Sequence, residues 1–231
     1  FFREHSKWDY NDAFKAGFIQ GDGACARLLS PKHKGLEVYF SEKDSEVAEE
    51  FHTTQARLYS TRAREIAVKY GLQPARIPDR GWPTKLPNDE VSAFLSGVFT
   101  ANGCVIASGK RVALKGTCKE FIEAVQYELK NLGIASYITT NKATTVKFDN
   151  GEYLCKQSYD LNITGNANLI RFIEKIGFFQ EYKRAALVET ILATAPRVSK
   201  VVPRGSALVY DFEEPETHWG VVEGVVVHNS E

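Results

Sequence analysis

The chain has 231 residues, of which 43% are hydrophobic and 25% charged, and its 29 basic residues balance its 29 acidic ones. This composition supports a folded core and excludes a mainly disordered protein. No apolar run approaches the roughly 20 residues of a membrane span, so we expect no membrane partner and a cytoplasmic, intracellular location. A neutral chain has no overall attraction to nucleic acid, so DNA binding would require basic residues gathered on one face.

The chain begins with Phe and contains no Met, and we expect that it is cut from a longer protein. Its cysteines form no Cys-x-x-Cys pair and have no His at ligand spacing; they are Cys25, Cys104, Cys118 and Cys155. Reduced thiols in or near the core are favoured over a metal site or a disulfide framework.

Two predicted helices share one pattern, DAFKAGFIQGDGAC at residues 12–25 and VSAFLSGVFTANGCV at residues 91–105. They superimpose when Gly17 is placed on Gly97. Each carries small residues four apart, and a Gly inside a helix costs about 1 kcal/mol relative to Ala. Since residues four apart share one face, the spacing predicts that the two helices pack closely against each other. Two unrelated, Gly-tolerant surface helices are the alternative.

Alternating hydrophobicity predicts the strands and amphipathic spacing the other helices. In the first half we expect strands at 25–30 and 36–41, joined by a turn, and then a helix at 43–58. In the second half we expect a hairpin at 104–116, a helix at 117–134, strands within 136–150 and 152–164, and helices at 166–178 and 182–194.

These elements predict an α+β fold, a monomeric pseudo-twofold tandem αββαββα repeat followed by a short β-rich C-terminal segment. The expected divisions are a first half at 1–74, a proline-marked connector at 75–90, a second half at 91–195 and the C-terminal segment at 196–231.

The first repeat helix ends in an acid, Asp22, where the negative end of the helix dipole disfavours it by about 0.3–1 kcal/mol. At a two-helix interface it would lie beside its repeat mate. Two carboxylates there would repel unless a divalent cation lay between them, which suits metal-assisted phosphodiester hydrolysis. An ordinary solvated Asp before a Gly turn is the other interpretation.

FKAGFIQGDG and FLSGVFTANG resemble the two signature helices of the LAGLIDADG homing endonucleases. ARIPDRGW at 75–82, residues 112–134 and FIEKIGFFQEYKRAAL at 172–187 are similar to further segments of those enzymes as found within inteins. The resemblance implies a monomeric saddle of two pseudo-symmetric halves, with β-ribbons in the major groove of double-stranded DNA, a long target site and Mg²⁺ held at the helix ends.

By this resemblance the metal site is formed by Asp22, Asn102, Gly21 and Ala101. Asn102 departs from the family pattern because an amide brings no negative charge. We therefore expect double-strand cleavage to be lost or severely weakened, with nicking as the residual activity. A cleavage-dead DNA-binding protein is the alternative.

The resemblance also implies two basic residues near the scissile phosphates, Arg76, where Lys is usual, and Lys183. Solvated surface cations are the alternative for both. The expected DNA-contacting cations on the ribbons are Arg27, Lys32, Lys34, Lys110, Arg111, Lys115, Lys142, Lys147 and Lys156.

VYDFEEPETHWGVVEGVVVHNSE at 209–231 resembles the C-terminal splice junction of an intein. The resemblance implies that Asn229 cyclises and cuts the bond to Ser230, the first extein residue, which Glu231 follows. His218 and His228 would supply acid–base catalysis. The N-terminal splicing half and the exteins are missing partners, so we expect no splicing by this chain alone.

Overall fold

The computed structural model describes residues 12–148, 151–194, 219–222 and 225–228. The chain divides into two compact units, Phe1–Ala195 and Pro196–Glu231. Among the described residues, no helix combines the length and apolarity needed to cross a membrane.

The first unit is built from helices and antiparallel strands, which confirms the α+β class. Its α-helices are α1 (Asp12–Asp22), α2 (Ser45–Glu50), α3 (Thr61–Lys69), α4 (Val91–Asn102), α5 (Lys119–Asn131), α6 (Asn166–Lys175) and α7 (Glu181–Thr194). Its strands are β1 (Leu36–Tyr39), β2 (Arg57–Ser60), β3 (Gly103–Ile106), β4 (Arg111–Gly116), β5 (Tyr137–Asn141), β6 (Thr144–Phe148), β7 (Gly151–Cys155) and β8 (Ser158–Thr164). The short 3-10 helices are η1 (Cys25–Arg27), η2 (Glu42–Asp44), η3 (Ile77–Asp79), η4 (Asn88–Glu90) and η5 (Ala107–Gly109).

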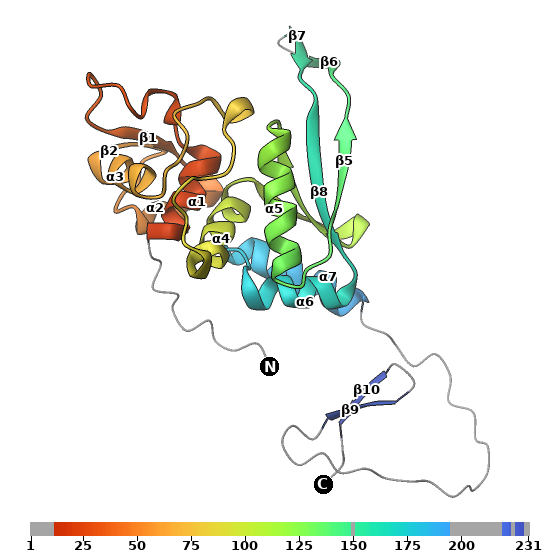
Figure 1. The fold of residues 1–231 in the computed structure, drawn as a ribbon. Coiled ribbons are helices and arrows are strands. Elements are labelled where there is room, and N and C mark those ends of the chain that lie inside the picture. The colour runs from red at the N-terminus through yellow and green to blue at the C-terminus, as the bar shows by residue number, and fades with distance from the viewer. Residues whose placement is uncertain (1–11, 149–150, 195–218, 223–224, 229–231) are drawn as a thin grey trace, which may run out of the picture. The chain divides into compact units, whose positions relative to one another are not determined.

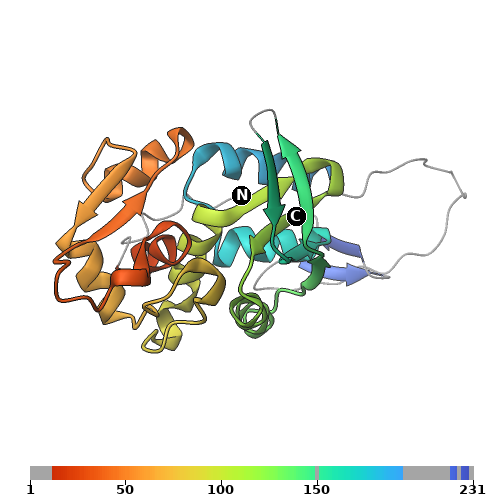
Figure 2. The same ribbon diagram turned by 90° about the horizontal axis from the view of Figure 1, so that it is seen from above.

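Helices α1 and α4 lie side by side at the centre of this unit (Figures 1 and 2). A Cβ on Gly17 would lie 1.9 Å from the carbonyl oxygen of Phe94, and a Cβ on Gly97 would lie 2.0 Å from that of Phe14. Since Phe14 and Phe94 are themselves repeat mates, the contact is reciprocal. The predicted packing of the two Gly-containing helices against each other is confirmed.

The second half follows the expected αββαββα order as α4, β3, β4, α5, β5, β8 and α6. Its four-stranded antiparallel sheet has the order β3-β4-β8-β5, and β6 and β7 pair at the far end of the ribbon that continues β5 and β8 (Figure 1). Val112 and Leu114 on β4 face the core opposite Ile163 and Leu161 on β8. Helix α5 packs on the sheet and buries its own apolar stripe.

The first half contains two strands, as many as the pattern predicted, but only β1 lies where a strand was expected. Residues 25–30 do not form a strand: Cys25–Arg27 is a 3-10 turn, and β1 pairs with β2 instead. The sequence CARLLS lacks β-branched residues and is rich in Ala and Leu, which favour helical conformations. Only Gly23, just after α1, forms a bridge to Val38 on β1.

The predicted bounds of the helix at 43–58 are also wrong, because the observed helix α2 spans only Ser45–Glu50. It begins after a capping box, in which the Ser41 hydroxyl and backbone N–H donate to Asp44, and α2 ends at Glu50. His52 adopts a left-handed conformation with φ 55°, and Thr53 and Thr54 follow. Since β-branched residues after a left-handed residue favour extended backbone, the chain continues into β2.

In the second unit, β9 (Trp219–Val222) and β10 (Val225–His228) form an antiparallel pair in which His228 lies opposite Trp219. The divisions predicted along the chain stay predictions.

Candidate functional site

The C-terminal ends of α1 and α4 meet at one place. A Cβ on Gly21 would lie 2.6 Å from both Ala101 Cβ and Asn102 Nδ2. Asp22 and Asn102, the last residues of the two helices, are half-buried and exposed, respectively. The structure therefore brings together the four residues expected at the helix ends.

Asp22 lies in an environment that opposes ionisation. Burial raises the pKa of its carboxyl to about 6, the negative charge of Asp44 adds to this rise, and the Lys183 ammonium opposes it. A carboxylate that is destabilised by desolvation and by a second acid is stabilised by a bound cation.

Lys183, on α7, is 7% exposed and donates from Nζ to the carbonyl oxygen of Thr100 over 2.6 Å. Burial lowers the pKa of its ammonium, while Asp44, Cys104 and Asp22 act in the opposite direction. Since Thr100 is near the end of α4, the amine caps that helix and stays close to the acids. The sequence-predicted Lys183 therefore lies within the candidate site.

Arg80 occupies the equivalent place at the end of α1. Its guanidinium donates to the carbonyl oxygen of Gln20 over 2.7 Å, and Gln20 is the repeat mate of Thr100. Arg76, the connector cation expected at the site, is exposed beside η3. The connector cation that is buried against α1 is instead Arg80, whose side chain is 2% exposed. No sequence signal marked Arg80, since the connector has no repeat mate to compare.

Two further residues were missed. Asp44 is buried and accepts a hydrogen bond of 2.7 Å from Gln180 Nε2, which also donates to the carbonyl oxygen of Thr100 over 3.0 Å. This bond ties η2 of the first half to the start of α7 in the second half. The Ser-x-x-Asp capping box was the only local signal for Asp44, and it indicates a helix start rather than a site.

The residues at the helix ends are suitable ligands for Mg²⁺. Within the described part of the chain, no group of three or more His, Cys, Asp or Glu side chains forms a metal cluster. Mg²⁺ does not need one, because it keeps several waters and binds through one or two carboxylates together with substrate phosphates. Asp22, with its raised pKa, and the amide oxygen of Asn102 supply such a partial set.

Asp22→Asn is expected to stabilise the protein in metal-free buffer at neutral pH. The folded pKa of about 6 lies above the ordinary 3.8. The contribution of Asp22 to stability is therefore fully present below 3.8 and lost as the pH rises through about 6. Because Asp22 is only half-buried, we expect a gain of about 1–3 kcal/mol near pH 7.5 and almost none near pH 3.5, measured by thermal unfolding.

The matched control is Asp89→Asn on η4, an exposed acid whose replacement should move the melting temperature little at either pH. An equal stabilisation by Asp22→Asn at both pH values would contradict the buried-acid account.

The outer face of the second-half sheet is polar. Arg111 and Lys115 on β4 alternate with its core residues and lie opposite Thr164 and Asp160 on β8. Lys110 is exposed at the tip of the β3–β4 hairpin in a left-handed conformation with φ 47°. Arg111 and Lys115 thus lie on the face of β4 opposite Val112 and Leu114, and their contact with a DNA groove stays a prediction.

Lys142 and Lys156 are exposed in the links between β5 and β6 and between β7 and β8. Lys147 lies in β6, opposite Glu152.

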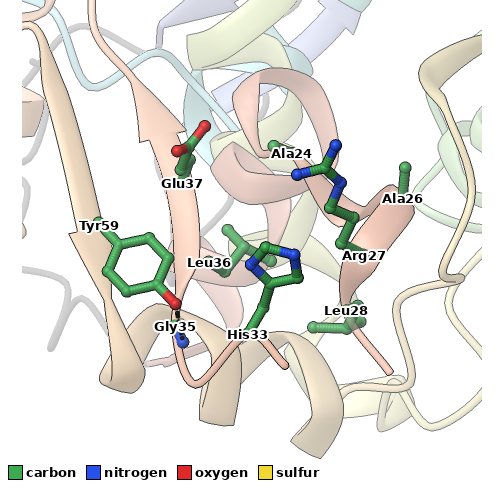
Figure 3. Close-up of a pocket in the computed structure, with 9 residues that line it drawn as sticks. All are labelled: Ala24, Ala26, Arg27, Leu28, His33, Gly35, Leu36, Glu37 and Tyr59. Carbon is green, nitrogen blue, oxygen red and sulfur yellow. Dashed lines mark hydrogen bonds between the residues drawn. The ribbon is translucent and has the colours of Figure 1, made fainter. Parts of the chain in front are cut away.

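The first-half cations Arg27, Lys32 and Lys34 do not lie on a ribbon. Arg27 is on η1, and the two lysines are exposed in the loop before β1. Arg27 instead lines a pocket of about 270 Å³, in which Figure 3 shows the His33 ring between Leu36 and Arg27. The other residues that line it are Ala24, Ala26, Leu28, Gly35, Glu37 and Tyr59.

Among the described cysteines, Cys25 and Cys118 are buried and Cys104 is exposed, all as free thiols. The residues expected to act in splicing lie in the second unit. His218, Asn229 and Ser230 are outside the described residues, and His228 is described only as the last residue of β10.

Residues 89–177, in the second half, match the family model described as a LAGLIDADG-like domain. The ATP-dependent DNA helicase Hel308 of Methanocaldococcus jannaschii is 30% identical over 58% of this chain and 11% of the helicase. The replication factor C small subunit of Thermococcus kodakarensis is 26% identical, over 68% of this chain and 17% of that subunit. The DNA polymerase of Thermococcus litoralis is 30% identical, over 64% of this chain and 9% of the polymerase. The chain thus spans less than a fifth of the length of these relatives.

Two solved structures are among those to which this chain is similar. I-DmoI in complex with DNA and Ca has a TM-score of 0.44 and 19% identity, covering 77% of this chain and 96% of that chain. Full-length DUF199/WhiA from Thermatoga maritima has a TM-score of 0.47 and 13% identity, covering 83% and 63%.

Proposed function

We propose that this chain is a Mg²⁺-dependent DNA endonuclease of the LAGLIDADG type, derived from an intein, whose cleavage is impaired by Asn102. The observation that supports this most strongly is that Lys183, bonded to Thr100 near the end of α4, acts electrostatically on Asp22 at the end of the closely packed α1. An acid to hold a divalent ion and a buried cation to bind a phosphate are the two groups that phosphodiester hydrolysis requires.

In this proposal Asp22 would hold the ion. Lys183 donates to a phosphate oxygen and stabilises the charge that develops there. The chemistry that a bound Mg²⁺ supplies is neutralisation of the phosphate and a lowered pKa for the attacking water. Asn102 offers only a neutral oxygen, so it weakens the ion site on its own side.

The intein origin rests on the nature of the relatives. A DNA helicase, a replication factor subunit and a DNA polymerase each match this chain over less than a fifth of their own length. A segment common to proteins of such different activities is expected of an inserted element. The resemblance of residues 209–231 to a splice junction supports the same origin. In it, Asn229 and Ser230 would form the cleaved bond.

The proposed DNA surface is the polar face of the β3-β4-β8-β5 sheet. Lys110→Asn keeps the left-handed conformation, which Asn tolerates, and removes one charge. We expect its affinity for duplex DNA to fall several-fold and the slope of log affinity against log salt to decrease by about 1. Fluorescence anisotropy over a salt series measures both.

The control for that variant is Lys130→Asn, an exposed cation on α5 rather than on the sheet. Affinity and slope should be unchanged by this substitution. If Lys110→Asn also leaves both unchanged, the sheet face is not the DNA surface.

The cleavage-dead DNA-binding protein remains the second candidate, because Asn102 carries no charge. One experiment distinguishes the endonuclease from the binding protein. The full chain and Mg²⁺ are incubated with supercoiled plasmids that carry genomic fragments into which the proposed intein has not been inserted. Nicked circles support the endonuclease. A plasmid that is bound but stays supercoiled supports the binding protein.

A further inference from the structure

Asp44 is a buried acid to which the proposed function assigns no role. It is the last residue of η2, in the first half, and is 8% exposed. One of its carboxylate oxygens, Oδ2, accepts hydrogen bonds from the backbone N–H and the hydroxyl of Ser41, over 2.8 and 2.6 Å. The other, Oδ1, accepts from Gln180 Nε2 over 2.7 Å. The bonds from Ser41 fix the carboxylate, which in turn holds a residue of the second half.

Gln180 is the residue at which α7 starts. Its backbone oxygen accepts from the backbone N–H groups of Lys183 and Arg184 over 3.2 and 3.1 Å, as expected of a helix N-cap. Its buried amide nitrogen has two hydrogens, one directed to Asp44 and the other to the carbonyl oxygen of Thr100 over 3.0 Å. Because a carboxylate can only accept, Asp44 keeps the NH₂ group of this amide turned toward Thr100.

Lys183 shares the acceptor that Gln180 uses. It lies in the first turn of α7, three residues after Gln180, and its ammonium donates to the same Thr100 oxygen over 2.6 Å. Residues three apart in a helix lie on one face, so the amide and the ammonium reach this oxygen together. The place of the ammonium therefore depends on where Gln180 is held.

A second acid of the first half contacts the start of α7. Both carboxylate oxygens of Glu46, on α2, lie 3.3 Å from the backbone nitrogen of Glu181, the first residue of the helix. The first N–H groups of a helix have no partner within it, and the helix dipole stabilises a carboxylate there. Glu46 and Asp44 thus each bind one of the residues at which α7 starts.

We propose that Asp44 is a positioning residue, which fixes the start of α7 through Gln180 and so holds the Lys183 ammonium at the end of α4. This inference rests on the proposed function, in which Lys183 donates to a phosphate oxygen of the DNA. It goes further by making the phosphate-binding group of the second half depend on an acid of the first half. Asp44 acts by way of Gln180 and not on the DNA.

The first measurement is the reactivity of the Lys183 amine in the full chain without DNA or metal. The chain is treated briefly with acetic anhydride far below its melting temperature, and mass spectrometry gives the rate of acetylation at each lysine. In wild type, Lys183 should react much more slowly than the exposed Lys130, because it is 7% exposed and hydrogen-bonded. Asp44→Ala should raise the rate at Lys183 by about 10-fold or more and leave that at Lys130 unchanged, because the released amine becomes accessible to solvent.

Val47→Ala is the matched control for a general loss of stability. Val47 is fully buried on α2, so its truncation weakens the packing of the same segment and keeps the bond between Asp44 and Gln180. It should leave the reactivity of Lys183 unchanged. Asp44→Asn serves if Asp44→Ala does not fold. Its amide has one oxygen and cannot accept at both the Ser41 and the Gln180 positions, so the reactivity of Lys183 should rise here too.

The second measurement is the rate at which each variant, with Mg²⁺, cuts a supercoiled plasmid that the protein binds. Asp44→Ala should slow cutting by about 10-fold or more with little change in DNA affinity, because Lys183 stabilises charge that develops on the bound phosphate. Added to Lys183→Ala, it should slow cutting no further, since Asp44 acts through Lys183. A purely structural role would give independent losses that add.

A Lys183 amine that stays protected in both Asp44 variants would overturn the inference. Additive losses of cutting rate would overturn it as well, and so would a reactive amine with unchanged cutting. If neither wild type nor any variant cuts a plasmid that it binds, the proposed endonuclease function fails. The acetylation rates then still decide whether Asp44 positions Lys183.

Discussion

Gly97→Ala is expected to lower the stability of the first unit by about 3 kcal/mol or more, although Ala is the better helix former. The added Cβ would lie 2.0 Å from the carbonyl oxygen of Phe14 and 2.7 Å from the backbone nitrogen of Phe18. Both contacts are with backbone, so the two helices would have to separate. Separation would also open the packing around Phe14 and Phe94, which are buried at the interface.

Thermal unfolding followed by circular dichroism measures this effect, which corresponds to roughly 6–12 °C for a domain of this size. Gly109→Ala is the control, because its Cβ would meet only the movable end of the Arg111 side chain, at 2.9 Å. Gly17→Ala should match Gly97→Ala, since the contact is reciprocal. Unchanged melting temperatures for both variants would show that α1 and α4 do not touch through these glycines.

The features of the fold that the sequence predicts are those with a local cause. Gly17 and Gly97 are costly inside helices unless another backbone approaches, so their spacing indicates the central helix pair. The second half alternates clearly, with Val112 and Leu114 on one face and Arg111 and Lys115 on the other. These patterns depend on neighbouring residues alone, and the structure confirms them.

The pairing of the first-half strands, and the places of Arg80, Asp44 and Gln180, could not be predicted in that way. Whether residues 25–30 form a strand depends on a partner, and β1 pairs with β2 from beyond α2 instead. Arg80 acquires its role from carbonyl oxygens about 60 residues earlier in the chain. Gln180 and Asp44 meet across the two halves of the unit. Such contacts arise from tertiary structure and leave no local pattern.

Asp22→Asn is expected to abolish the proposed nicking, by at least about a thousandfold, because it removes the only carboxylate at the helix ends. Asn102 already lacks a charge, so no acid would remain there to hold Mg²⁺. The substitution is isosteric, and the pKa of about 6 for Asp22 means that the same change should stabilise the metal-free fold. Loss of activity therefore cannot be attributed to unfolding.

Nicking of a supercoiled plasmid that the protein binds, and thermal unfolding, measured on the same preparation, test this pair of effects. Asp89→Asn is again the control and should nick at the wild-type rate. If the variant is more stable but inactive, Asp22 destabilises the fold and is needed to bind the ion. Active sites commonly show this exchange of stability for function. Wild-type nicking by Asp22→Asn would instead place the catalytic ion elsewhere, and Asp44, the other acid acting on Lys183, would be the residue to replace next.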